Sequence, residues 1–214
     1  MEVLNMGNTN LKPEETSQYN VGVTWSSSCG DWLRHFSISA DGYYNTVKDK
    51  IVALPTMYVW KMMNMGEVDI KGVDVNLSTQ FRLPLRMSLL LASTYSFQYA
   101  VDVTDPEAKN YKDQIPYTPR HSGTVSVTLE NPWVNVSYIL TAVGDRYALP
   151  QNIDRNRIDS YIEQSISINR DFRFRYFGLR LQGELLNLAN VNYDVIQYYP
   201  MPGRSWRLSI CLSY

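Results

Sequence analysis

Residues 87–104 read MSLLLASTYSFQYAVDVT, in which apolar and polar side chains alternate almost without a break. In an extended chain one face would carry the apolar side chains, interrupted only by Ser93: Met87, Leu89, Leu91, Tyr95, Phe97, Tyr99, Val101 and Val103. At about 3.3 Å per residue, this strand would exceed the usual length in a soluble sheet and could cross a membrane on a tilted path. The stretch therefore predicts a transmembrane β-strand.

The same period of two recurs on both sides of this stretch and brings the number of predicted strands to nine. The other eight segments are 19–25, 36–47, 68–81, 124–129, 133–140, 161–169, 177–185 and 204–214. Within 68–81 the alternation changes phase around Gly72, which predicts a β-bulge. No helical pattern separates the segments, so the chain is predicted to be all-β, an antiparallel up-and-down sheet without an internal domain boundary.

Short and long connections take turns along the chain. The short links are 26–31, 83–86, 131–132 and 170–175, and the long ones lie near 51–65, 105–120, 147–157 and 192–203. In a meander this places every short turn at one end and every long loop at the other, as in outer-membrane barrels with periplasmic turns and extracellular loops. An aromatic girdle is predicted at the short-turn end: Trp25, Trp32, Phe81, Trp133, Phe172, Phe174 and Tyr214. A second group lies nearer the other end: Tyr95, Phe97, Tyr99, Tyr138 and Trp206.

The composition supports a membrane barrel over a soluble one. Hydrophobic residues make up 44% of the chain, and its aromatic residues are mostly amphipathic, with 16 Tyr and five Trp against six Phe. A soluble β-sandwich or lipocalin-like barrel also alternates, but its outer face would be rich in Lys and Glu, whereas the polar face here is mostly Ser, Thr, Asn and Gln. No apolar run is long enough for a membrane helix, and residues 1–10 lack the pattern of a secretion signal.

Charge and cysteine content exclude several classes of function. A formal net charge of -1 gives no basic face for nucleic acid, and the alternation of Arg170, Arg173 and Arg175 with phenylalanines is a poor stacking platform at the turn of a barrel. Cys29 and Cys211 suggest neither a zinc site nor a disulfide framework.

Acid–base and nucleophilic catalysis also lack candidates in this sequence. The chain has two histidines: His35 is predicted to face the lumen and His121 to begin a strand. The carboxylates of Asp102, Glu163 and Glu184 are predicted to face the lumen on separate strands and to be solvated there. We therefore expect no catalytic or metal site and no enzyme activity.

The long loops hold the candidate binding residues. Met57, Met62, Met63 and Met65 form a thioether cluster that would suit Cu(I), although flexible loop packing explains it as well. Clustered aromatic rings could instead contact a large planar or apolar ligand, and the ligand-contact candidates are Tyr58, Trp60, Tyr198 and Tyr199.

The stretch 184–214, ELLNLANVNYDVIQYYPMPGRSWRLSICLSY, resembles the closing strands of TonB-dependent outer-membrane receptors. In that family an Asn-Leu-x-Asn-x-x-Tyr pattern precedes the last loop, and Pro-Gly-Arg leads into the last strand. The matching residues here are Asn187, Leu188, Asn190, Tyr193, Pro202, Gly203 and Arg204. NTNLKPEET (8–16), IPYTPRH (115–121) and GDRY (144–147) are similar to family segments in the expected order.

The resemblance implies a barrel of about 22 strands around an N-terminal plug. Nine strands alone would leave two unpaired sheet edges, which lipid does not tolerate. Residues 1–214 would therefore be the C-terminal portion of the barrel, without the plug, the TonB-contacting segment and more than half of the wall. The last strand would pair with the first, and Tyr214 is similar to the terminal aromatic read by the barrel assembly machinery of the outer membrane.

The resemblance also implies a function in the outer membrane of a Gram-negative bacterium. It implies import of a large scarce ligand, an iron–siderophore, haem or cobalamin, driven by TonB acting on the plug, with no cofactor and no covalent chemistry. A passive porin and a non-transporting truncated receptor remnant are the alternatives.

Overall fold

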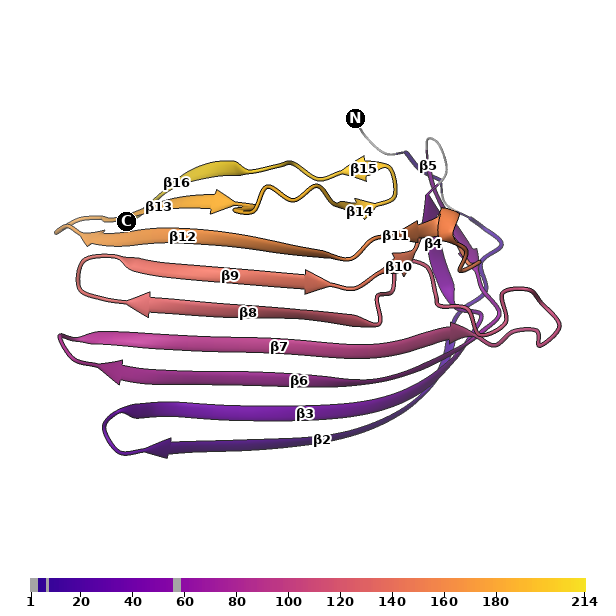
Figure 1. Ribbon diagram of the computed structural model, residues 1–214, viewed down its shortest axis with the longest axis horizontal. Helices are drawn as coiled ribbons and strands as arrows, with labels where there is room; N and C mark the ends of the chain where they lie inside the picture. Colours follow the sequence, from indigo (N-terminus) through magenta and orange to yellow (C-terminus); the bar gives the residue numbers. More distant parts are fainter. Residues whose placement is uncertain (1–3, 7, 56–58) are drawn as a thin grey trace.

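The computed structural model describes residues 4–6, 8–55 and 59–214, and one nine-stranded sheet dominates it (Figure 1). Its strands are β2 (Glu15–Cys29), β3 (Leu33–Lys48), β6 (Glu67–Leu83), β7 (Met87–Asp102), β8 (His121–Glu130), β9 (Asn135–Val143), β12 (Tyr161–Arg173), β13 (Gly178–Leu186) and β16 (Ser205–Ser213). All neighbouring pairs are antiparallel and follow the order of the chain, so the predicted meander of nine strands is confirmed.

Short elements occupy the long connections and the segment before β2. They are β1 (Leu4–Met6), β4 (Ile51–Pro55), β5 (Val59–Asn64), β10 (Arg146–Tyr147), the 3-10 helix η1 (Asp154–Asn156), β11 (Arg157–Ile158), β14 (Asp194–Ile196) and β15 (Tyr199–Pro200). In Figure 1 they gather at one end of the sheet, while the other end carries only tight turns. The predicted alternation of short turns and long loops is thereby confirmed.

The strand register separates an apolar face from a polar one. Leu89 of β7 lies between Phe81 of β6 and Leu129 of β8, and Val75 lies opposite Tyr95. On the other face polar groups pair: Ser96 Oγ donates to Asp74 Oδ1 at 2.5 Å. Because only the apolar face suits lipid, we call it the outer face and the polar one the inner face.

No helix among the described residues is long and apolar enough to span a membrane.

Aromatic side chains gather at the short-turn end, as predicted. The rings of Trp25 and Phe36 meet edge to face with centroids 5.4 Å apart, and those of Trp32 and Phe81 stack at 5.8 Å. Trp133 lies in a turn and is exposed. Such rings are typical of the boundary between lipid and water.

Two predicted turns begin later than expected. Residues 170–173 of the predicted link 170–175 belong to β12, which continues to Arg173, and the turn spans 174–177. The backbone N–H of Phe174 donates to the carbonyl of Phe177 at 2.9 Å, and their rings stack at 4.6 Å. Likewise β2 continues through most of 26–31, to Cys29. The charged residues at the end of β12 resemble a polar turn in the sequence, but they alternate with phenylalanine and continue the strand.

The predicted bulge at Gly72 is wrong. Gly72 pairs with Tyr43 on one side and Gln98 on the other without a shift in register. A Cβ atom at this glycine would lie 2.5 Å from the Tyr43 hydroxyl oxygen, so the tyrosine occupies the space that a side chain would need. Register shifts occur instead near the turn between β2 and β3. The change of phase has another cause, which lies on the inner face.

A small apolar cluster covers the inner face next to the long loops. It consists of Val47, Met65, Val68, Ala100 and Ile115, with Val52 and Ile70 packed against it. The loop that contains Ile115 runs along β7, because its N–H donates to the carbonyl of Ala100 at 3.0 Å. Val68 and Ile70 face inward, where this loop covers them. The apolar positions of β6 therefore change from the inner to the outer face along the strand, although the strand contains no bulge there.

Candidate functional site

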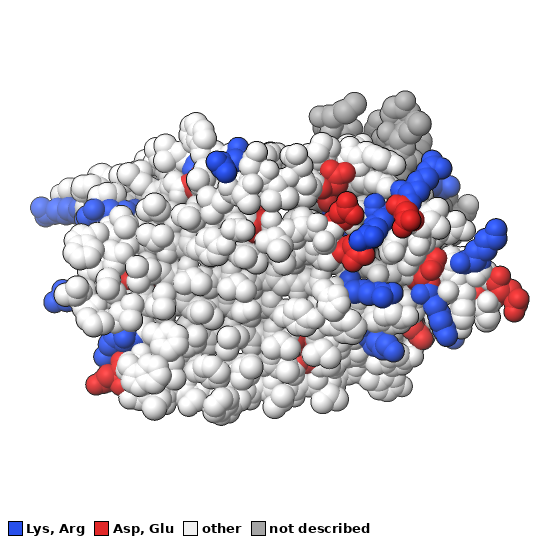
Figure 2. Space-filling model, viewed as in Figure 1, with Lys and Arg blue, Asp and Glu red and all other residues white. Residues whose placement is uncertain are grey.

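The loop end of the sheet carries most of the charged side chains visible on one face of the molecule. Figure 2 shows Lys, Arg, Asp and Glu gathered there, with a smaller group at the turn end and almost none over the middle of the sheet. The charged side chains of this face are therefore concentrated at the loop end of the sheet.

Arg146 of β10 is the most deeply placed cation of this loop end, with 4% of its surface exposed. Its Nη2 donates to the carbonyls of Asp194 at 2.6 Å and Val195 at 3.1 Å, which ties β10 to β14. Its guanidinium lies 5.5 Å from the ring centroid of Tyr161, and the Tyr161 ring stacks on Tyr193 at 4.2 Å. Burial lowers the pKa of Arg146 from its usual value, and Nη1 has no hydrogen-bond partner among the described residues.

Tyr193 completes this cluster of stacked side chains. Burial raises the pKa of its hydroxyl, and the nearby carboxylate of Glu163 raises it further. The backbone of the Tyr117 loop joins from a third connection, because its N–H donates to the carbonyl of Tyr147 at 2.7 Å. The loops 103–120, 144–160 and 187–204 thus form one cross-linked layer rather than three independent segments.

A hollow of about 440 Å³ lies between the last two of these loops. Its lining includes Arg155, Arg157, Asp159, Tyr193 and Tyr198. Arg157 lies 3.6 Å from Asp145 and 3.8 Å from Asp159, so its charge is partly neutralised. The remaining lining combines aromatic rings with hydrogen-bonding groups, an arrangement that suits a ligand with both planar and polar parts.

The four predicted ligand-contact residues have different surroundings. Tyr198 lines the hollow and is 77% exposed, while Tyr199, on β15, is exposed but is not among the described lining residues. The backbone of Trp60 pairs with Asn5 and Pro55 in β5, and Tyr58 lies outside the described residues. Of the four predicted contacts, Tyr198 is the one that the described structure places in the hollow.

The motif residue Asn187 forms the centre of a hydrogen-bonded clasp after β13. It is 3% exposed and has a φ of 51°, a left-handed conformation that asparagine tolerates better than most residues. Its Nδ2 donates to the carbonyls of Val191 at 2.9 Å and Pro202 at 3.3 Å, and its Oδ1 accepts from the Val191 N–H at 2.9 Å. Its own N–H donates to Glu163 Oε1 at 2.8 Å, so the clasp is anchored to β12.

The second half of the motif closes the same clasp from the start of β16. The Arg204 N–H donates to Asn190 Oδ1 at 2.8 Å, and its Nη2 donates to the carbonyl of Leu188 at 2.5 Å. A Cβ atom at Gly203 would lie 2.7 Å from Asn190 Oδ1, which explains the glycine. Tyr214 follows β16 at the turn end and is exposed. The motif thus brings the two ends of the last loop together.

The three carboxylates that were expected to be solvated in the lumen have hydrogen-bond or ion-pair partners in the protein. The Asp102 carboxylate is buried and accepts from Thr104 N at 2.9 Å and from Asn110 Nδ2 at 2.8 Å, which orders the loop after β7. Glu163 accepts from the clasp, and Glu184 pairs with Arg207 of β16. Their role as simple polar lining is therefore corrected: each ties neighbouring segments together.

The described methionines of the predicted thioether cluster do not point to a common site, and the two histidines lie on different strands. Met65 is buried in the inner cluster, whereas Met62 and Met63 are consecutive in β5 and so point to opposite sides; Met57 lies outside the described residues. His35 pairs with Gln80 on the inner face, and His121 begins β8, where Nδ1 lies 2.8 Å from the Tyr95 hydroxyl. The described residues include no group of three or more His, Cys, Asp or Glu able to hold a metal ion.

Several residues of the site were not among the predicted contacts. Arg146, Arg155, Arg157 and Tyr161 all contribute to the cross-linked layer or the hollow. Only Arg146 carried a signal, because it belongs to the GDRY segment at 144–147. The others come together through loop folding, which has no local signature in the sequence.

The profile of the family described as "TonB dependent receptor-like, beta-barrel" matches residues 2–188. Among curated proteins, none matches this sequence.

Solved receptors share the fold at low sequence identity. The ferric preacinetobactin receptor BauA of Acinetobacter baumannii superposes with a TM-score of 0.70 at 13% identity, covering 94% of this chain and 30% of its own. The ferric citrate transporter FecA gives 0.71 at 12% identity, covering 94% and 31%. The copper transporter OprC gives 0.68 at 16% identity, covering 95% and 32%. The chain thus spans about a third of each of these proteins.

Proposed function

The chain belongs to the TonB-dependent receptor-like β-barrel family, and we propose that it forms the C-terminal part of the wall of an outer-membrane receptor. The receptor imports a large scarce ligand, an iron–siderophore chelate, haem or cobalamin, across the outer membrane of a Gram-negative bacterium. The rest of the barrel and the plug belong to the remainder of the protein, and TonB energises import by acting on the plug. The barrel assembly machinery engages the C-terminal strand, which ends in Tyr214.

The separation of faces along the nine strands is the observation that carries this proposal. An apolar outer face, a polar inner face and loops gathered at one end are what a transmembrane wall with an external binding surface requires. The band almost free of charge in Figure 2 agrees with a lipid-facing surface. The two unpaired edges, on β2 and β16, agree with a wall that continues into further strands.

The loop layer supports a large ligand with aromatic contacts. Stacked Tyr161 and Tyr193 beside the buried Arg146 make a rigid base, and Tyr198 exposes its ring above the adjacent hollow. Rigid aromatic surfaces bind planar ligands with little loss of conformational entropy. Two of the structural neighbours named above are described as carrying ferric chelates, which favours an iron chelate here.

Replacing Tyr58, Trp60, Tyr198 and Tyr199 together by Ala in the complete receptor is expected to weaken ligand binding at least about tenfold, equivalent to about 1.4 kcal/mol. The rings supply contact area that alanine cannot replace. Cells that depend on the receptor are supplied with a labelled ferric siderophore, haem or cobalamin, and uptake is measured against concentration.

The matched control replaces Trp133 and Tyr176, exposed aromatic residues of the turn end, by Ala and should leave uptake unchanged. Unaltered uptake by the fourfold variant in a folded barrel would move the recognition surface away from these rings. Uptake that continues in cells without TonB would identify a passive porin, and no uptake of any of the three ligands would identify a non-transporting remnant.

A further inference from the structure

The outer face of the sheet has a notch where β13 lacks a side chain. Gly183 faces outward between Ile168 of β12 and Leu208 of β16, its partners in register. A Cβ atom at Gly183 would meet no heavy atom within 4 Å. Ile166, Leu181 and Leu185 extend the walls, and the hollow measures about 550 Å³.

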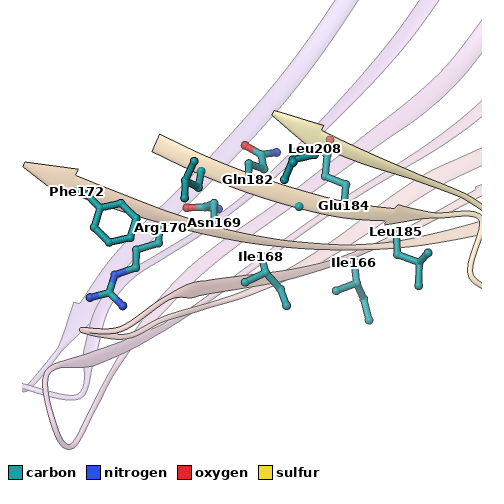
Figure 3. Close-up of a pocket in the computed structure, with 11 residues that line it drawn as sticks. Ile166, Ile168, Asn169, Arg170, Phe172, Gln182, Glu184, Leu185 and Leu208 are labelled. Atoms are coloured by element: carbon teal, nitrogen blue, oxygen red, sulfur yellow. The ribbon is translucent and has the colours of Figure 1, made fainter. Parts of the chain in front are cut away.

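The notch opens on the apolar side of the strands. In Figure 3 the side chains of Ile166, Ile168 and Leu185 project to one side of β12 and β13, and Gln182 and Glu184 project to the other. The apolar walls would therefore be in contact with the hydrocarbon region of the membrane, and an alkyl chain is the shape that fits such a groove.

An arginine marks the end of the groove nearest the turns. Arg170 lies on β12 opposite Leu181 and shares the outer face with Phe172, whose ring centroid is 4.8 Å from its guanidinium. It is exposed and makes no ion pair among the described residues. Asp171, the adjacent carboxylate, lies on the inner face and is bound twice by Arg180, through Nε at 2.6 Å and Nη2 at 3.0 Å.

The charge around this end favours an anionic occupant. Arg173 follows Arg170 at the end of the same strand, β12. With Asp171 already neutralised by Arg180, this part of the rim has a net positive charge. Arginine binds phosphate oxygens through paired N–H groups, and basic residues near a membrane surface attract anionic lipid headgroups.

We infer that the groove at Gly183 and the guanidinium of Arg170 together form a binding site for an anionic phospholipid of the periplasmic leaflet. One acyl chain lies along the groove over Gly183, and the phosphate accepts hydrogen bonds from Arg170. The inference rests on the proposed location in the outer membrane, where the short turns face the periplasm.

Native mass spectrometry of the complete receptor in non-ionic detergent tests this site by titration with phosphatidylglycerol and with diacylglycerol of the same chains. Arg170→Gln is expected to weaken phosphatidylglycerol binding about fivefold and leave diacylglycerol binding unchanged, since only the phosphate contact is lost. Arg175→Gln is the matched control: it removes the same charge from the turn, where Arg175 stacks on Tyr176, and should change either affinity less than about twofold.

The groove itself is tested by the series Gly183→Ala, Gly183→Val and Gly183→Leu. Each added methyl group fills more of the notch, so binding of both lipids should fall progressively, by about tenfold for leucine. The smallest change meets no neighbouring atom, so the series retains at least one folded variant. Heat-modifiable mobility on gels verifies that each barrel is folded.

Three results would overturn the lipid site. The first is an equal loss of phosphatidylglycerol affinity in Arg170→Gln and Arg175→Gln. The second is lipid affinity that does not change when the notch is filled. The third is a doubled protein mass in place of bound lipid, which would assign the groove to a second copy of the chain. Fractionation of the same cells separates this inference from the proposed function. Wild-type protein found outside the outer-membrane fraction would contradict the function, whereas correct fractionation with unchanged lipid affinity in Arg170→Gln would contradict the lipid site alone.

Discussion

Replacing Asn187 by Ala is expected to lower the free energy of unfolding of the barrel by about 3 kcal/mol. The substitution removes three side-chain hydrogen bonds to Val191 and Pro202 and leaves buried backbone groups without partners. It also forces alanine into a φ of 51°, where its Cβ is strained. Urea titration of the refolded receptor in detergent, followed by tryptophan fluorescence, measures the loss.

Asn192→Ala is the matched control in the same loop. Asn192 is exposed and donates or accepts no side-chain hydrogen bond among the described residues, so its loss should change stability by less than about 0.5 kcal/mol. Asn187→Gly should be less destabilising than Asn187→Ala, because glycine removes the strain but not the lost bonds. Equal stabilities for Asn187→Ala and Asn192→Ala would show that the clasp contributes nothing to the folded barrel.

Gly72→Val should destabilise the wall by a similar amount, about 3 kcal/mol, through steric overlap on the inner face. The new Cβ would lie 2.5 Å from the Tyr43 hydroxyl and closer still to the carbonyl oxygen of Phe97. The tyrosine ring can move, but the carbonyl belongs to the hydrogen-bonded ladder of β7. The same urea titration measures the effect.

Gly183→Val provides the control for this prediction, because a Cβ at Gly183 meets no atom within 4 Å. It should be neutral or slightly stabilising, since valine favours a strand more than glycine does. Adding Tyr43→Ala to Gly72→Val should restore part of the stability and not all of it, because the clash with Phe97 remains. Similar losses at the two glycines would refute the steric explanation.

The period of side chains was sufficient to predict the sheet, and it failed where loops cover the wall. Lipid on one side and a polar interior on the other impose alternation on β7, so its faces follow from sequence alone. At Val68 and Ile70 the loop around Ile115 covers the inner face and allows apolar residues there. Alternation along a single strand contains no information about loops that cover it, so the change of phase at Gly72 has the pattern of a bulge although no bulge is present.

The candidate site was less predictable than the wall. The spacing of Asn187, Asn190 and Arg204 matched a family pattern, but their role as a clasp depends on backbone groups that no pattern reveals. The hollow beside Tyr198 forms from two loops whose relative position is set by Arg146. The partner of Asp102 could not be predicted either, because the residues around Asp102 do not indicate that the following loop returns to bind its carboxylate through Asn110.

The pairing of each strand with its neighbour in sequence has a consequence for the route of folding. Each hairpin of the sheet joins strands that are consecutive in the meander, through a tight turn or one long loop, and the cost of loop closure grows only slowly with loop length. Each hairpin can therefore form as soon as both its strands have been synthesised. In the proposed barrel, the edges of β2 and β16 wait for partners from outside this sheet. The entropic barrier to a closed wall is thereby concentrated in its final pairing, and the contact order of all preceding steps stays low.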